Sequence, residues 1–350
     1  MEVVKSRKRR LIYNIFFSLS VFHCALLSGR LIQLFFLSDD AIELHLLSLT
    51  LIAVSTYNIF TLSNWFISFP RLDLLVVLFQ ESSWYKSHSE SELNHRQRKL
   101  TIPDRSVVMM PQASFPSACV IPLCYLLYPT MPFLAISCVP EEYQTIPVTM
   151  FCLAWDTFQI LMLTTFGFYF GFVHLNFLNE FNQALSRTLI KLRWTNKTGE
   201  QIQLILKELK ALCLQLEFYN LAMCNANYGM KLVMMIMGIL GIFSFVRLFA
   251  EHSVIAAMNL LLGLDCLFFY PLAFGTGFVI PEKVDTIKAK SLLLSKNLWS
   301  YKARQGIRVV VDSIPTKGIK EGEFHTMQRD STLNYFSFVF EKVVDLLLTF

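Results

Sequence analysis

The sequence has 350 residues, of which 54% are hydrophobic and only 16% are charged, whereas soluble domains carry about a quarter charged residues. This composition, with a mean hydropathy of +0.47, excludes an ordinary soluble protein and predicts an integral membrane protein. The net charge of +5 is spread over separate segments and forms no continuous basic stripe, so no nucleic-acid partner is expected.

Seven apolar segments follow one another along the chain. The hydrocarbon core of a bilayer is ~30 Å thick and is crossed by ~20 apolar residues in a helix. The predicted spans are residues 11–37, 41–69, 118–139, 147–178, 232–250, 254–280 and 333–350. The sequence therefore predicts an all-α fold, a single polytopic bundle of seven transmembrane helices.

Positive charge is confined to one side of this predicted bundle. All but three of the 31 Lys and Arg residues fall before the first span or in the three connections on the same side. The opposite connections contain acidic residues and no cation, and the remaining cations lie within spans: Arg30, Arg247 and Lys342. Because Lys and Arg are enriched in cytoplasmic loops, we expect the N-terminus in the cytoplasm and the C-terminus outside.

Two long connections on the cytoplasmic side, residues 179–231 and 281–332, have helical patterning. The segment from Thr198 to Gln201 matches a capping box, which starts a helix. The apolar residues that follow are spaced three and four apart and predict one buried face: Ile202, Ile205, Leu209, Leu212 and Leu216. The stretch after Pro281 is the expected partner for that face, in the same chain or in a neighbouring one.

Ionisable residues in the last predicted span can line a path for cations, form an ion pair between helices, or indicate that the span is misplaced. Glu341, Lys342 and Asp345 lie within about one turn, where a charge near the membrane centre costs ~2.5–3.5 kcal/mol. Lys342 and Asp345 are three residues apart and can neutralise each other. Alternatively, the carboxylates are exposed to a path for cations.

Two further acids are expected to be buried in spans, Asp156 in the fourth and Asp265 in the sixth. Arg247, in the fifth span, is a candidate ionic partner for one of them. A structural Asp156–Arg247 salt bridge and a role in ligand binding both fit the sequence.

No pattern of a catalytic or metal site is evident. The sequence has no Gly-rich phosphate loop, no Gly-x-Ser-x-Gly elbow and no His-Glu-x-x-His helix. The eight cysteines include no Cys-x-x-Cys pair, and no histidine has metal-ligand spacing from another His or a Cys. We therefore predict that the protein is not an enzyme and has no catalytic residue, metal or cofactor.

The end of the chain adds a motif to this architecture. Gly322-Glu-Phe324 is followed by Arg329, by Leu333 at the start of a Phe-rich run, and by the terminal Phe350. With seven spans, a cytoplasmic N-terminus, short outer loops and long helical cytoplasmic connections, the sequence resembles the insect gustatory and odorant receptor superfamily. It resembles a divergent gustatory-receptor-like member.

The divergence lies in the last helix. Gustatory receptors have Thr-Tyr where this sequence has Lys342 and Val343, and Gln where it has Thr349. The resemblance implies a chemosensory, ligand-gated cation channel of the plasma membrane that functions in taste. Its implied partners are a small-molecule ligand, membrane lipid and further subunits in a homo- or heterotetramer.

The resemblance also implies the positions of a pore and a ligand pocket. The last span would line or border the pore with Phe336, Phe340, Glu341, Val343, Asp345, Leu347, Thr349 and Phe350. The outer halves of spans two to six would form a pocket for a small, partly apolar ligand with Tyr57, Tyr128, Phe151, Trp155, Asp156, Phe243, Arg247 and Asn259. Ordinary helix packing is the alternative for both sets.

Two other functions fit less of the sequence. A divergent member could keep the fold without conducting ions and act as a partner subunit. An unrelated membrane transporter is the other alternative, and inverted internal repeats, which would favour it, are not evident. A G-protein-coupled receptor would require the opposite charge asymmetry.

Overall fold

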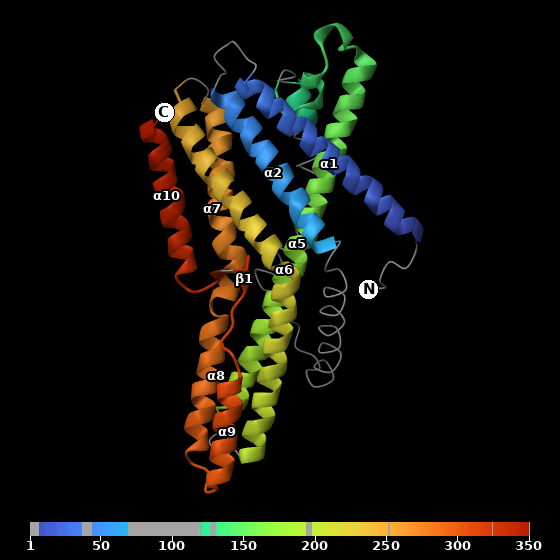
Figure 1. The fold of residues 1–350 in the computed structure, drawn as a ribbon. Helices are drawn as coiled ribbons and strands as arrows, with labels where there is room; N and C mark the ends of the chain where they lie inside the picture. The colour runs from blue at the N-terminus through green and yellow to red at the C-terminus, as the bar shows by residue number, and fades with distance from the viewer. Residues whose placement is uncertain are drawn as a thin grey trace, which may run out of the picture.

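The computed structural model describes residues 7–36, 44–68, 119, 121–126, 131–193, 198–250, 253–323 and 325–349, and most of them are helical (Figure 1). Four helical stretches in these ranges are long and apolar enough to cross a membrane: Leu11–Leu34, Ile146–Thr165, Gly199–Leu248 and Ala256–Ser295. A shorter apolar helix covers Thr50–Leu62. These features are those of a multi-pass helical membrane protein.

Four helices lie at segments predicted to be helical, within a few residues at each end. They are α1 (Arg7–Phe36), α2 (Leu44–Ser68), α7 (Ser253–Phe278) and α10 (Ser331–Thr349). Together with the adjoining halves of α5 and α6 they form what we term the apolar bundle, at the top of Figure 1. Many large apolar side chains on its surface are exposed, among them Phe36, Leu126, Ile146 and Leu348, as expected for contact with lipid.

Two very long helices connect this bundle to the rest of the molecule. α5 (Ile146–Lys191) has 46 residues and α6 (Gly199–Leu248) has 50, which at 1.5 Å per residue gives roughly 70 and 75 Å. A bilayer core of ~30 Å covers less than half of that length. Each helix therefore continues from a predicted span into a predicted connection without a break, and its remainder extends beyond any membrane.

The extended halves of α5 and α6 pack with α8 (Ile280–Ser295) and α9 (Tyr301–Ser313) into a second bundle, which we term the stalk. The capping box of Thr198 and Gln201 is present at the start of α6. All five residues of the predicted apolar face are buried there, and the stretch after Pro281 covers them through Val284 and Ile287. Both predictions for this region are confirmed, and the partner is in the same chain.

Close contact between α6 and α7 depends on glycine. A Cβ atom on Gly241 would lie 2.6 Å from the carbonyl oxygen of Asn259 and 2.8 Å from the Cα atom of Gly263. Backbone atoms cannot move aside as a flexible side chain can. The two helices therefore meet backbone to backbone, as small residues allow in membrane bundles.

The connection from α9 to α10 contains a small hairpin that the sequence did not predict. Strands β1 (Lys320–Glu321) and β2 (His325–Thr326) pair antiparallel. Gly322 follows β1 with a φ of 69°, a conformation that glycine adopts without steric cost. Strands of two residues are too short for the alternating pattern by which sequences reveal strands.

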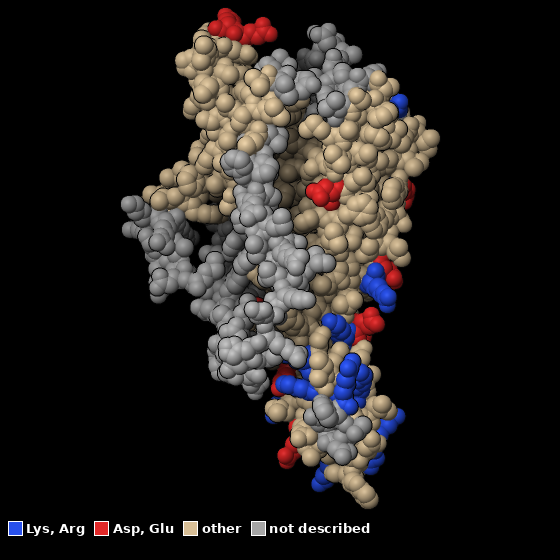
Figure 2. All heavy atoms as spheres, turned by 180° about the vertical axis from the view of Figure 1, so that it is seen from behind, with Lys and Arg blue, Asp and Glu red and all other residues tan. Residues whose placement is uncertain are grey.

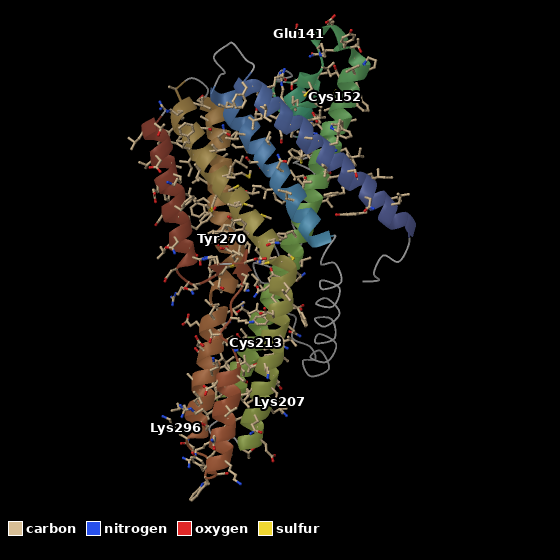
Figure 3. All side chains as sticks on the ribbon, in the orientation of Figure 1. Glu141, Cys152, Lys207, Cys213, Tyr270 and Lys296 are labelled. Atoms are coloured by element: carbon tan, nitrogen blue, oxygen red, sulfur yellow. The ribbon has the colours of Figure 1, made fainter. Side chains whose placement is uncertain are left out.

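The predicted span 118–139 differs from the structure at its second half. Residues 121–126 are helical, but the described residues from Met131 onward form a turn, the 3₁₀ helix η1 (Ala135–Cys138) and, beyond the predicted span, η2 (Glu141–Tyr143). Pro132 and Pro140 flank η1, and proline disfavours a continuous helix. Leu134 and Ile136 pack with Cys152 of α5 in a separate apolar cluster near the tip marked by Glu141 (Figure 3).

Candidate ligand-binding and pore regions

A buried polar cluster lies between α1, α5 and the segment before η1. One carboxylate oxygen of Asp156, Oδ2, accepts hydrogen bonds of 2.8 Å from the Tyr125 hydroxyl and from the Ala135 backbone N–H. The side chain is only 2% exposed. The other oxygen, Oδ1, is buried and has no hydrogen-bond partner among the residues that the structure describes. A buried oxygen in that state can accept a hydrogen bond from a water molecule or from a ligand.

Aromatic side chains extend this cluster toward α2. Trp155 donates its Nε1–H to Nδ1 of His23 at 3.1 Å. The ring of His23 lies 4.8 Å from the ring of Tyr57, edge to face. His23 on α1 therefore connects two residues of the predicted pocket, one on α5 and one on α2. The three rings form an aromatic wall beside the carboxylate.

One turn beyond Asp156, Gln159 continues the polar row. Its Oε1 accepts a hydrogen bond of 3.3 Å from Ser20 Oγ, while its Nε2 is buried and no described residue accepts a hydrogen bond from it. Gln159, Ser20 and Tyr57 line a cavity of about 30 Å³. This volume suits a water molecule or one polar group of a ligand.

A larger opening lies between α1 and α2. This groove has a volume of about 800 Å³ and is lined by Asn14, Phe17, Ser18, Val21, Cys24, Ala25, Ser28, Asn58, Thr61 and Leu62. Its size is in the range of small-molecule sites. Thr61 lines both the groove and the small cavity, so the two are adjacent.

The structure brings together only part of the predicted pocket. Phe243 is buried on α6, Asn259 is buried where α7 meets Gly241 of α6, and no hydrogen bond joins either residue to Asp156. Phe151 is 70% exposed on α5, and Arg247 is exposed in the last turn of α6. Tyr128 lies outside the described residues.

The predicted Asp156–Arg247 salt bridge is not formed. The partners of Asp156 are a hydroxyl and a backbone N–H, and Arg247 makes no ion pair with any described residue. Asp265, expected to be buried, is exposed on the surface of the chain. The correction has a physical reason: the two uncharged donors stabilise Asp156 without a cation.

Sequence reasoning missed His23, Tyr125 and Gln159, which complete the polar cluster. His23 and Gln159 are polar residues within long apolar segments. Polar groups in a membrane segment usually face the interior of the bundle. The position of His23 and Gln159 within apolar segments could therefore have identified them as buried polar residues. Tyr125 gave no such signal because tyrosine is common among apolar residues at membrane surfaces.

The last helix has a packed face and an exposed face. Ser331, Tyr335, Val339 and Val343 are buried at intervals of four residues. Val339 lies against α6, with its Cγ1 3.7 Å from the position of a Cβ on Gly238. The side chain of Val343 packs into the chain's own core, and its place at a pore stays a prediction. Phe336 and Leu347 are partly buried against the same core.

The exposed face of α10 contains the remaining described pore candidates: Phe340, Glu341, Asp345 and Thr349. Lys342 Nζ lies 2.7 Å from Asp345 Oδ2 and 3.4 Å from Glu341 Oε1. The predicted pairing of Lys342 with Asp345 is therefore confirmed. Phe350 lies outside the described residues.

Comparisons with known proteins identify solved structures that have a similar fold. No family model matches the chain, and no curated protein matches it in sequence. A solved structure of the insect olfactory receptor OR5 from Machilis hrabei matches with a TM-score of 0.67 at 12% identity, covering 99% of this chain and 91% of that one. The structure of the same receptor in complex with eugenol matches with a TM-score of 0.62 at 11% identity, over the same shares of the two chains. The chain thus shares the fold of an insect olfactory receptor and, as its sequence indicated, resembles the insect odorant and gustatory receptor superfamily.

Proposed function

We propose that the protein is a chemosensory receptor subunit, a ligand-gated cation channel of the insect odorant and gustatory receptor type. The observation that carries the proposal is the fold match to OR5 along 99% of the chain. A match of this extent includes the apolar bundle and the stalk together, so it is not the likeness of one common helical motif. The gustatory type follows from the end of the sequence, with Gly322, Arg329 and Phe350 in the expected order.

The distribution of charge supports a cytoplasmic stalk and a plasma-membrane location for the bundle. On the face seen in Figure 2, Lys and Arg lie mainly over the stalk, while the surface of the apolar bundle is mostly uncharged. Positive residues are enriched on the cytoplasmic side of membrane proteins. With seven spans, the N-terminus is then cytoplasmic and the C-terminus extracellular.

Topology is tested with glycosylation tags on the full-length chain. A tag after Phe350 should be modified in the endoplasmic reticulum, and a tag before Met1 should stay unmodified. The reverse pattern would contradict the proposed orientation and with it an extracellular ligand site.

The proposed ligand site is the polar and aromatic cluster of His23, Tyr57, Trp155 and Asp156 with the adjacent groove. Supporting observations are the buried Asp156 Oδ1, which has no hydrogen-bond partner within the described part of the chain, and the three-ring wall. Such a site suits a small aromatic molecule with one hydrogen-bond donor. Eugenol, the compound bound to OR5, has this chemistry and is a practical first probe.

In the proposed channel, the α10 helices of four copies surround a shared axis, and Glu341 and Asp345 lie on the exposed face of each α10. Carboxylates at a pore favour cations. The decisive experiment is an image of the purified full-length assembly. Four-fold symmetry with α10 at the axis would support the channel, and a monomer would exclude a shared pore.

One observation favours a second candidate, a partner subunit that does not conduct ions by itself. Lys342 holds Asp345 at 2.7 Å and places a positive charge on the face proposed to line the pore. A cation there opposes cation flow. If cells expressing this chain alone carry no current and gain one with Lys342→Thr, the native role is that of a partner in a heteromer.

A further inference from the structure

Four side chains from four different elements, three of them buried and the Lys231 side chain partly exposed, form a continuous row where the apolar bundle meets the stalk. Lys231 of α6 donates to Glu321 Oε2 of β1 at 2.6 Å. Tyr270 of α7 donates its hydroxyl to Glu321 Oε1. The ring of Tyr270 stacks on that of Tyr335 in α10, with centroids 4.4 Å apart and planes 25° apart. Figure 3 shows Tyr270 at mid-height of the molecule, near the hairpin.

Burial makes each contact in this row costly to lose. Glu321 is 2% exposed, Tyr270 0% and Tyr335 2%. A buried carboxylate is stable only while cations and hydrogen-bond donors surround it, and removal of one partner leaves an uncompensated charge. Lys231 and Tyr270 are the principal partners of Glu321, and His325 Nε2 lies further away, at 3.8 Å. The position of the Tyr270 ring therefore depends on Glu321.

The hairpin that carries Glu321 is itself fixed to α6. Asn220 donates its Nδ2 to the Gly318 carbonyl and accepts at Oδ1 from the Lys320 backbone N–H, each at 2.9 Å. Asn227 donates to the Lys320 carbonyl at 3.2 Å. The Gly322 N–H donates to the Cys224 carbonyl at 2.9 Å. These hydrogen bonds hold Glu321 of β1 in a fixed position against α6.

Tyr335 connects the row to the last helix. It lies in the second turn of α10, and its hydroxyl donates to the Cys266 carbonyl of α7 at 3.3 Å. One face of its ring meets Tyr270, so a shift of Tyr270 displaces or frees Tyr335. The start of α10 is therefore held by α7 through a ring whose own position depends on Glu321.

We propose that Glu321 is a positioning residue for α10, acting through Tyr270 and Tyr335. Through this row of contacts, the relative position of α6 and α7 determines the position of the start of α10. The positioning role stands on the contacts alone, whereas its consequence for gating rests on the proposed function, in which α10 lines the pore.

Hydrogen exchange of the purified full-length protein tests the positioning role. Glu321→Gln removes the charge, and Tyr270→Phe removes only the hydroxyl and keeps the ring. Both variants should speed backbone exchange in residues 331–339 by about tenfold, because local opening becomes easier when a buried partner is lost. Glu208→Gln is the matched control, since Glu208 forms an exposed ion pair with Lys191, and it should leave residues 331–339 unchanged.

A variant of Tyr335 distinguishes an effect that reaches α10 through Tyr335 from local loosening of the hairpin. In a Tyr335→Leu background, Glu321→Gln should no longer change exchange in residues 331–339. If Glu321→Gln has the same effect in both backgrounds, or affects only residues 318–327, the positioning role is refuted. Should Glu321→Gln fail to fold, Tyr270→Phe in the same two backgrounds gives the same decision.

Current recordings test the link to gating. At equal surface expression, Glu321→Gln and Tyr270→Phe should each change the current without added ligand by at least about threefold in the same direction, and together by no more than one alone. Additive effects, or unchanged currents with altered exchange, would reject a role in gating. No current in any variant, with the expected exchange result, would contradict the proposed channel and leave the positioning role supported.

Discussion

The stalk and the apolar bundle are built from the same two helices, α5 and α6, yet they differ in how their packing is encoded. In the stalk, most apolar residues of α6 lie on one face, and that face is buried against α8 and α9. In the apolar bundle, the same helix is apolar nearly all round, and close packing depends on glycines. A water-exposed helix reveals its buried face by contrast with polar residues, whereas a helix in lipid has no such contrast.

The largest expected effect on stability comes from a change in the buried face of α6 in the stalk. Leu209→Ala removes a side chain with no exposed surface from the α6 face. We expect a loss of roughly 2–5 kcal/mol, since a buried Leu→Ala change leaves a cavity. Thermal unfolding in detergent measures the effect. Leu204→Ala, at a site 60% exposed, is the control and should be nearly neutral.

In the bundle, a change that adds a single methyl group should be harmful. Gly241→Ala places a Cβ 2.6 Å from the Asn259 carbonyl oxygen, and we expect about 1–3 kcal/mol of destabilisation from overpacking. The amount of folded protein after gel filtration at increasing temperature reports it. Gly275→Ala meets no atom within 4 Å and should be neutral or stabilising. Equal behaviour of the two variants would show that the α6–α7 contact is looser than described.

The next prediction tests whether Asp156 is held by Tyr125 and Ala135 and not by a salt bridge with Arg247. Asp156→Asn disturbs the hydrogen bonds from Tyr125 and Ala135, and we expect a cost of about 1–3 kcal/mol. Because Arg247 is exposed and unpaired among the described residues, Asp156→Asn and Arg247→Gln should be additive within about 0.5 kcal/mol. A double-mutant cycle on thermal stability measures this, and strong coupling would restore the salt bridge.

The smallest expected effect concerns the start of α6. Thr198→Ala removes the hydroxyl that accepts from the Gln201 backbone N–H, and caps of this kind contribute about 1 kcal/mol. Thermal unfolding should detect the loss. Thr198→Ser keeps the hydroxyl and should match the native protein, whereas an equal loss in both variants would assign the effect to the methyl group.

Much of the helical framework could be predicted from sequence, but only part of the candidate site. The spans near 11–37, 41–69 and 254–280 have helices at the predicted places because long apolar runs are unambiguous. The site was incomplete because the partners of Asp156 come from residues 21 and 31 positions away along the chain, and no spacing rule connects them. The burial of Val343 could not be read from the sequence because large apolar residues such as Phe340 and Leu348 also lie on the exposed side of α10.

The sequence by itself determined where most of the helices form, how α6 begins, which face of the stalk is buried and that Lys342 and Asp345 lie close enough to pair. All of these depend on neighbours within a turn or two, or on the contrast between apolar and polar residues. Only the tertiary structure decided that Glu321 meets Lys231 and Tyr270, and that Tyr270 stacks on Tyr335. Those contacts join residues 51 to 90 positions apart, so the packing of whole helices, which lipid-exposed sequences encode weakly, had to bring them together.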